Sequence, residues 1–231
     1  MLFFYWLLAQ KGVAVKATLV MITGMDPQNL EIRDFTGGMA QTNGYLIGSG
    51  DKDEACILID APLGICEWLD RLEVLPTDLL LTHQHYDHVE DVAKLVAKGL
   101  RLHAYAQYSQ ELTLEILLQQ SGIPIKVDPY CVDHLLEGQT ELNVGGLRFD
   151  LEHVPGHSPD SVVFIYDGLL FGGDTLFAGG VGRADLPDGN MELLLSGIRD
   201  KLLTLPPNTR VFPGHGPETN IKAEKATNPF L

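Results

Sequence analysis

The stretch that decides the fold is Thr-His-Gln-His-Tyr-Asp-His, residues 82–88, directly after the apolar run Leu79–Leu81. Imidazole binds zinc and other divalent transition metals, and carboxylate joins it where the ion is harder. His83 and His85 lie two positions apart, so on an extended segment both can point the same way and hold one ion. Asp87 and the histidine after it stand at the start of an expected helix, where they can reach a second ion. Solvated histidines in a polar turn, as in a purification tag, fit less well, because a tag is terminal and flanked by low-complexity sequence.

The composition is that of a globular protein and argues against some partners. The chain has 231 residues, 45% hydrophobic and 20% charged, which is ample for a sizeable core. Its net charge of -15 argues against a nucleic-acid surface, which needs clustered lysine and arginine. A bound pair of cations would be a positive island in this field and would draw an anionic substrate. The three cysteines, Cys56, Cys66 and Cys131, form no CxxC pair, so we expect packing roles and a reducing cytoplasm rather than a disulfide framework.

The first eight residues, MLFFYWLL, form a short apolar run. It is far below the ~18 residues needed to span a bilayer, and no lysine or arginine precedes it, as one would in a secretory signal. We expect residues 1–24 to be a leader outside the fold and residues 25–231 to form a single domain. A weak signal peptide cleaved near Ala17 is the alternative.

Alternating and continuous apolar runs indicate strands, and apolar residues at a spacing of three to four indicate helices. The expected strands span residues 30–35, 45–47, 55–59, 79–81, 101–105, 142–144, 147–154, 162–166, 169–171 and 210–212. The expected helices span residues 64–75, 89–98, 109–120 and 191–203. Both halves run from strands to a helix, which suggests two sheets with helices outside both. Asp87 is also placed to cap the helix that follows it, and Asp60 either forms a turn or orients a ligand loop.

Three later strands end in polar turns that contain a candidate metal ligand. They read EHVPGH at 152–157, GGDT at 172–175 and PGHG at 213–216. Small residues beside each candidate let backbone approach closely, as a crowded site requires. We expect the remaining histidines to be structural or solvated, with His153 able to support a ligand from behind. These histidines are His103, His134 and His153.

Taken together, the motifs THQHYDH, VPGHS, GGDT and FPGHG resemble the successive motifs of the metallo-β-lactamase superfamily, from about Leu30 onward. Within it the sequence resembles the glyoxalase II-like (hydroxyacylglutathione hydrolase-like) proteins. This likeness rests on GGDTLF, on Gly-Arg-Ala-Asp at 182–185 and on the closing residues 228–231. The resemblance implies an α/β fold, a four-layer αββα sandwich with metals at one rim of its two sheets.

The resemblance also implies two divalent metal ions, with zinc expected and iron or manganese as alternatives. It puts His83, His85 and His157 on the first ion and Asp87, His88 and His215 on the second, with Asp174 bridging. Asp174 stands where many zinc β-lactamases place a cysteine, and His85 stands where the di-iron flavoprotein relatives place a glutamate. We therefore expect neither of those activities.

The implied function is a metal-dependent hydrolase, a thioesterase that cleaves glutathione-type or other small-thiol thioesters with a hydroxide held by the two ions. Asp87 is the candidate catalytic residue, because it can orient that hydroxide while it binds the second ion. A thiol has a pKa of only about 8.5, so the thiolate can leave without a general acid. The alternative is a persulfide dioxygenase, which would use one iron held by His83, His157 and Asp174. A non-catalytic metal-binding module is a third class.

We expect a small-molecule thioester as the partner, no nucleic acid and no membrane, a cytoplasmic location, and a monomer or small homo-oligomer. Full-length glyoxalase II enzymes carry a further helical domain that contacts glutathione, and those contacts are expected to be absent here or made differently. Arg183 is the nearest basic candidate for a substrate carboxylate, but a salt bridge with Asp185 is the stronger expectation. The sequence departs from common relatives at Tyr86, at Glu90-Asp91 and at Asp160.

Overall fold

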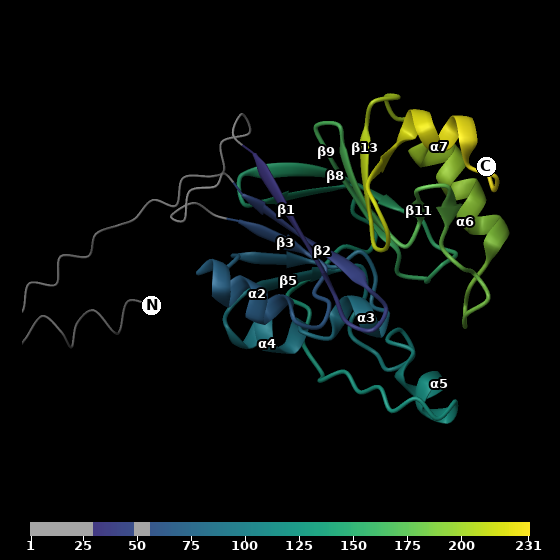
Figure 1. Ribbon diagram of the computed structural model, residues 1–231. Helices are drawn as coiled ribbons and strands as arrows, with labels where there is room; N and C mark the ends of the chain where they lie inside the picture. The colour runs from purple at the N-terminus through teal and green to yellow at the C-terminus, as the bar shows by residue number, and fades with distance from the viewer. Residues whose placement is uncertain (1–29, 49–55) are drawn as a thin grey trace, which may run out of the picture.

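Two six-stranded sheets face each other in the computed structural model, which describes residues 30–48 and 56–231 (Figure 1). The first sheet has the order β1 (Glu31–Gly37), β2 (Thr42–Gly48), β3 (Ile57–Ile59), β4 (Asp78–Leu80), β5 (Arg101–Ala104) and β6 (His134–Leu135). Strands β1 to β3 pair antiparallel, and β3 to β6 pair parallel. The predicted leader, residues 1–24, and Ala55 of an expected strand lie outside the described residues.

The second sheet has the order β14 (Thr219–Asn220), β13 (Arg210–Pro213), β10 (Leu169–Gly173), β9 (Val162–Tyr166), β8 (Leu147–His153) and β7 (Glu141–Val144). Only β10 and β13 pair parallel; the other neighbours are antiparallel. A small hairpin, β11 (Leu176–Phe177) and β12 (Gly180–Val181), stands apart from both sheets.

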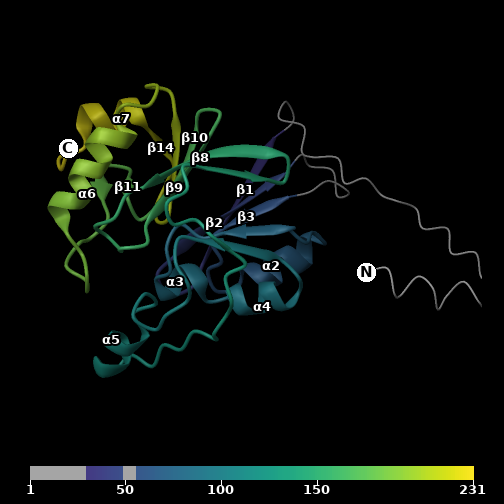
Figure 2. The same ribbon diagram turned by 180° about the vertical axis from the view of Figure 1, so that it is seen from behind.

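Helices cover the outer face of each sheet, as both views show (Figures 1 and 2). On the first sheet lie α2 (Ile65–Leu72), α3 (Tyr86–Val89) and α4 (Val92–Ala97). On the second lie α6 (Met191–Gly197), its continuation as the π-helical segment η3 (Ile198–Leu202), and α7 (Ile221–Thr227). Helix α5 (Glu115–Gln120) projects away from the sandwich. None of the helices in the part of the chain described above is long and apolar enough to cross a membrane.

Alternation along the strands divides the core into three layers. In β3, Leu58 packs toward the helices of the first sheet, whereas Ile57 and Ile59 join the cluster between the sheets. In β9, Phe164 faces that middle cluster and Val163 packs under the helices of the second sheet. Strands covered on both faces are apolar throughout, as these are. The predicted αββα sandwich is therefore confirmed.

The structure corrects several local predictions. The helix expected over residues 89–98 is shorter: α4 covers residues 92–97, and Val89 is the last residue of a separate helix, α3. The helix expected from residue 109 begins only at Glu115. Asp87 does not cap α3: the helix starts at Tyr86, its cap position is His85, and no side chain caps it. The Asp87 carboxylate instead accepts a hydrogen bond from Thr42 at 2.6 Å.

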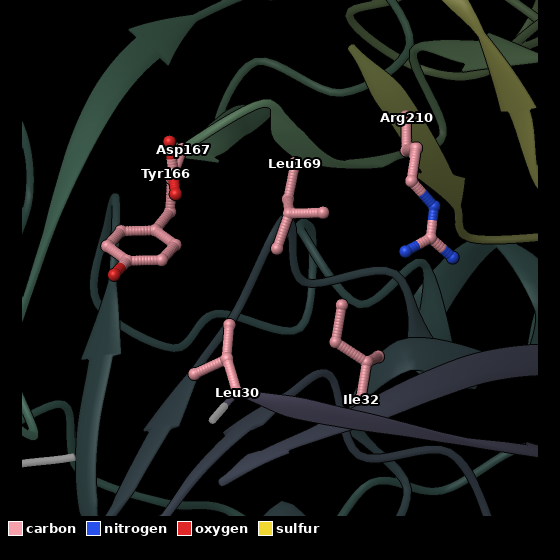
Figure 3. Close-up of a pocket in the computed structure, with 6 residues that line it drawn as sticks. All are labelled: Leu30, Ile32, Tyr166, Asp167, Leu169 and Arg210. Carbon is pink, nitrogen blue, oxygen red and sulfur yellow. The ribbon is translucent and has the colours of Figure 1, made fainter. Parts of the chain in front are cut away.

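The two rims of the sandwich differ in chemistry. Figure 3 shows a hollow between the sheets at the rim where β10 and β13 begin, lined by Leu30, Ile32, Tyr166, Asp167, Leu169 and Arg210. Its cation, Arg210, is paired with Glu218 at 2.6 Å. At the opposite rim β4, β10 and β13 end, and there the predicted metal ligands gather.

Candidate metal centre

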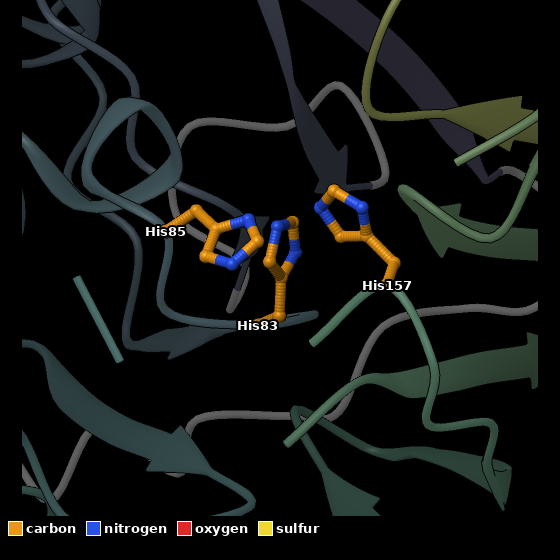
Figure 4. Close-up of side chains that lie close together, drawn as sticks. All are labelled: His83, His85 and His157. Carbon is orange, nitrogen blue, oxygen red and sulfur yellow. The ribbon is translucent and has the colours of Figure 1, made fainter. Parts of the chain in front are cut away.

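The loop after β4 and the loop after β8 bring three histidines together (Figure 4). The ring centroids of His83 and His85 are 4.6 Å apart, those of His83 and His157 4.9 Å, and those of His85 and His157 4.5 Å. One nitrogen of each ring lies within 4.8 Å of the others. These residues are called the three-histidine group below.

A second cluster, called the mixed group below, consists of Asp87, His88 and His215. Both histidines approach one carboxylate oxygen, Oδ2 of Asp87: Nε2 of His215 at 3.3 Å and Nε2 of His88 at 3.7 Å. Asp87 and His88 come from α3, in the first half of the chain, and His215 follows β13 in the second. The mixed group therefore spans both sheets, as the three-histidine group does.

Asp174, directly after β10, lies between the two groups. Its Oδ2 is 3.4 Å from Nε2 of His157 and 3.3 Å from Nε2 of His215, and its Oδ1 is 3.3 Å from Nε2 of His88. Gly214 makes this approach possible, because a side chain there would collide with the Asp174 carboxylate and the His88 ring. All seven predicted ligands thus lie in one cluster.

The buried nitrogens of this cluster have the pattern of metal ligands. Nδ1 of His88 donates to Asp60 at 2.9 Å, Nδ1 of His157 donates to the Arg183 carbonyl at 2.7 Å, and Nδ1 of His83 lies 3.2 Å from the Thr82 hydroxyl. Nε2 of each of the three rings is buried with no hydrogen-bond partner among the described residues. Such atoms are rare in folded proteins, and a ring held at one nitrogen with the other free is typical of metal-binding histidine. The donor set therefore fits divalent metal ions.

Known proteins share most of this chain, the metal-ligand rim included. The model of the metallo-beta-lactamase superfamily matches residues 37–215. The chain belongs to this superfamily. Among curated relatives, the probable metallo-hydrolase YqgX of Bacillus subtilis is 40% identical over 84% of this chain and 94% of its own length. Hydroxyacylglutathione hydrolase GloC of Haemophilus influenzae is 38% identical over 88% of this chain and 98% of its own.

Solved structures share the fold, and one of them holds metal. The BLEG-1 B3 metallo-beta-lactamase superposes with a TM-score of 0.78 at 34% identity, over 87% of this chain and 99% of its own. TTHA1623, solved in a di-iron-bound form, superposes with a TM-score of 0.74 at 35% identity, over 86% of this chain and 100% of its own. The protein is accordingly a metal-dependent hydrolase of the metallo-beta-lactamase superfamily.

Buried hydrogen bonds hold the ligand loops of this superfamily member in place. Asp60 accepts from the Thr82 amide at 2.8 Å, from the Thr82 hydroxyl at 2.7 Å and from His88. Its backbone is left-handed, with φ of 58°. Asp60 therefore does both things that the sequence left open: it makes the turn and it orients a ligand.

The start of β2 fastens the loop that carries His215, a role that sequence reasoning missed. Asn43 donates to the carbonyls of Pro213 and Gly216 at 3.1 and 2.9 Å, and the Tyr45 hydroxyl donates to Pro213 at 2.7 Å. Nothing in the local pattern around residue 43 signals a partner about 170 positions away. The contact becomes visible only when the two sheets pack against each other in the structure.

Burial and neighbouring charges set the protonation of the cluster. Burial lowers the pKa of His85 to about 3, and it lowers the pKa of His83 well below the usual value. Burial alone would lower the pKa of His215 as well, but the carboxylates of Asp174 and Asp87 raise it to about 10. His83 and His85 are therefore neutral near pH 7, and neutral imidazole is the form that binds metal.

The other predicted side chains lie outside the cluster. His103 donates to Asp78 at 2.8 Å and stacks on His134. His153 stacks on Tyr105 and donates to the Pro159 carbonyl. The predicted salt bridge of Arg183 with Asp185 is confirmed, with contacts of 2.7 and 2.8 Å.

Proposed function

We propose that this protein hydrolyses thioesters of glutathione or of another small thiol. The reaction adds water to the thioester carbonyl and releases a carboxylate and a thiol. One observation carries the proposal: seven side chains form a single cluster in which Asp174 reaches histidines of both groups. The likeness to GloC over nearly its full length supports the choice of thioester.

We assign one divalent ion to His83, His85 and His157, a second to Asp87, His88 and His215, and the bridging position to Asp174. Zinc is the proposed metal, and the di-iron form of TTHA1623 makes iron the first alternative. When bound, such a pair supplies a nucleophilic water at neutral pH and polarises the substrate carbonyl.

Asp87 is the proposed catalytic residue. Thr42 donates to its Oδ2 at 2.6 Å and Nε2 of His215 lies 3.3 Å from the same atom, so the carboxylate is held in one orientation. Burial alone would raise the pKa of Asp87, but His88, His215 and Thr42 together lower it well below the usual value. An ionised carboxylate at this place can accept a hydrogen bond from the attacking water and aim it.

Arg183 offers no free cation to the thiol part of the substrate, because its guanidinium is paired with Asp185. We therefore propose that the metal pair, rather than surface lysine or arginine, attracts the substrate. A small-molecule substrate, a cytoplasmic location, no nucleic-acid or membrane partner, and a monomer or small homo-oligomer complete the proposal.

The test is metal analysis of the purified protein together with cleavage of S-lactoylglutathione. We expect about two ions per chain and thioester cleavage that Asp174→Ala abolishes. Unchanged cleavage by that variant would sink the assignment. A chromogenic β-lactam belongs in the same assay, because BLEG-1 is a β-lactamase. Faster cleavage of the lactam than of the thioester would show that the substrates are β-lactams and not thioesters.

A second candidate is a persulfide dioxygenase with one iron on His83, His157 and Asp174. The likeness to ETHE1 from Myxococcus xanthus, with a TM-score of 0.70 at 26% identity over 86% of this chain and 83% of its own, favours keeping it. Oxygen uptake by the iron-loaded protein with glutathione persulfide, without thioester cleavage, would select this reaction.

A further inference from the structure

The residue between the two histidines of the HxH motif, Gln84, has no exposed surface. Its amide Nε2 donates to Oδ2 of Asp160 at 3.2 Å and to the Ala106 carbonyl at 3.0 Å. Its Oε1 accepts from the Tyr130 hydroxyl at 2.9 Å. Since His83 and His85 flank it and turn toward the metal cluster, Gln84 ties the back of that loop to its surroundings.

Asp160 is the partner that connects Gln84 to the loop of His157. It is 2% exposed, and its Oδ1 accepts from the Ser158 hydroxyl at 2.5 Å, one residue after His157. No lysine, arginine or histidine forms an ion pair with Asp160 among the residues that the structure describes. A carboxylate buried without a cation is costly, and burial raises the pKa of Asp160. The hydrogen bonds that the Asp160 carboxylate accepts from the side chains of Gln84 and Ser158 offset part of this cost.

These contacts bridge two loops that come from different sheets. The loop of His83 and His85 follows β4 of the first sheet, and the loop of His157 follows β8 of the second. Besides the main-chain bond from Val162 to Thr82 at 2.8 Å, the side-chain bond of Gln84 to Asp160 joins the two loops. The mixed group does not depend on it, because Asp60 holds His88 and Thr42 holds Asp87.

We propose that Gln84 and Asp160 form a positioning pair that fixes His157 relative to His83 and His85, and so sets the metal affinity of the three-histidine group alone. The pair touches neither substrate nor reacting atoms. The proposal rests on the metal assignment made under the proposed function, but not on thioester chemistry.

The test is a zinc titration of the full-length, metal-stripped protein in competition with a chromophoric chelator and without substrate. His157→Ala first identifies the binding phase that belongs to the three-histidine group, because it removes one of that group's ligands. We expect Asp160→Ala and Gln84→Ala each to weaken that phase about 10–100-fold, the usual cost of losing a group that orients a ligand. The other phase stays unchanged. The loss in the double variant is smaller than the sum of the two single losses, because the single variants share one of the bonds that they remove.

Two further variants make the result specific. Asp160→Asn keeps the shape of the side chain and one of its two hydrogen bonds, so it gives a smaller loss and serves where the alanine variant does not fold. Asp78→Ala is the matched control, since Asp78 is a similarly buried aspartate at the start of β4, the end opposite the loop of His83 and His85; it lowers the melting temperature and leaves both zinc phases unchanged.

Unchanged zinc binding by Asp160→Ala would overturn the proposal. So would equal weakening of both phases together with a lower melting temperature of the metal-free protein, which is the result of a merely structural role. If the wild-type protein binds no zinc or other divalent ion, the proposed function fails along with the pair. If it binds zinc in two phases but cleaves no thioester, only the proposed function fails.

Discussion

At the scale of single residues, the cluster of seven candidate metal ligands depends on glycine as much as on the ligands themselves. Gly214 lies next to His215, and its missing side chain leaves the space that the Asp174 carboxylate and the His88 ring occupy. Gly216 stands on the other side of His215, with φ of +75° and open space where a side chain would be. The two glycines are therefore there for different reasons: one for space and one for backbone conformation.

We predict that Gly214→Ala loses most metal binding and at least about 100-fold of the thioesterase rate, since displaced metal-supporting groups cost 10–100-fold each. Gly216→Ala is the control, and it should cost only about 1–2 kcal/mol of stability for a left-handed alanine. Metal content per chain and the melting temperature of both variants check this. Full metal content in Gly214→Ala would show that the cluster can rearrange, against the prediction.

At the scale of elements, helix α6 positions the loop of His157 from outside the cluster. The side-chain oxygen of its cap residue, Asn190, accepts from the Leu193 main-chain amide at 3.0 Å. The main-chain amide of Asn190 donates to the Gly156 carbonyl at 2.8 Å. The start of the helix is thereby joined to the residue before His157.

We predict that Asn190→Ala lowers the free energy of unfolding by about 1 kcal/mol, the usual cost of a lost helix cap. Zinc affinity should change little, because the main-chain bond to Gly156 remains. Denaturant unfolding measures the first quantity. The control is Asn208→Ala, an exposed loop asparagine; an equal loss of stability in that variant would contradict a capping effect.

Strand β4 begins with a buried aspartate, Asp78, whose effect on stability depends on pH. Burial alone would raise the pKa of Asp78, but hydrogen bonds from His103, Arg101 and Thr77 lower it to about 2. A carboxyl whose pKa is lower in the folded than in the unfolded chain stabilises the fold above its unfolded pKa of about 3.9. That contribution is lost as the pH falls through the folded value.

We therefore predict that Asp78→Asn is less stable than the wild type by roughly 1–3 kcal/mol near neutral pH, the range for hydrogen bonds to charged groups. The difference should shrink between about pH 4 and pH 2, where the wild-type carboxyl takes up its proton. Urea unfolding of both proteins across that range is the measurement. A difference that is independent of pH would show that Asp78 acts through packing alone.

The same elements show what can be predicted from sequence and what cannot. Strands with alternating apolar residues such as β8, and the four motifs at strand ends, are local patterns. The layers of the sandwich and the seven clustered residues could therefore be predicted. The short strands β6, β11, β12 and β14 and helix α7 were missed, because two to seven residues carry too little periodicity. The start of α5 was misplaced, since Glu115 is buried there and accepts from Tyr108 and the Val127 amide. Those partners lie 7 and 12 positions from Glu115, beyond the spacing of three to four residues that indicates a helix.

At the scale of the whole molecule, the cluster of seven candidate metal ligands lies between the two sheets and joins loops from both. Each proposed ion takes ligands from both halves of the chain: His83 and His85 meet His157, and Asp87 and His88 meet His215. The cluster lies at one rim, while the packed core between the sheets runs to the other. Bound metal would therefore link the sheets where their packing ends.

We predict that removing the two metals lowers the melting temperature by roughly 16–32 °C, twice the shift expected for a single ion. An ion present at about 1,000 times its dissociation constant adds about 4 kcal/mol to the stability of the folded state, and each kcal/mol shifts the melting temperature of a chain of this size by about 2–4 °C. Calorimetry before and after chelation, and again after zinc is restored, measures the change. Asp174→Ala is the matched variant, because it removes a side chain that reaches histidines of both groups, so chelation should shift its melting temperature much less. Equal melting temperatures of the wild type with and without metal would mean that the sheets hold together independently of this rim, and that the cluster serves the chemistry alone.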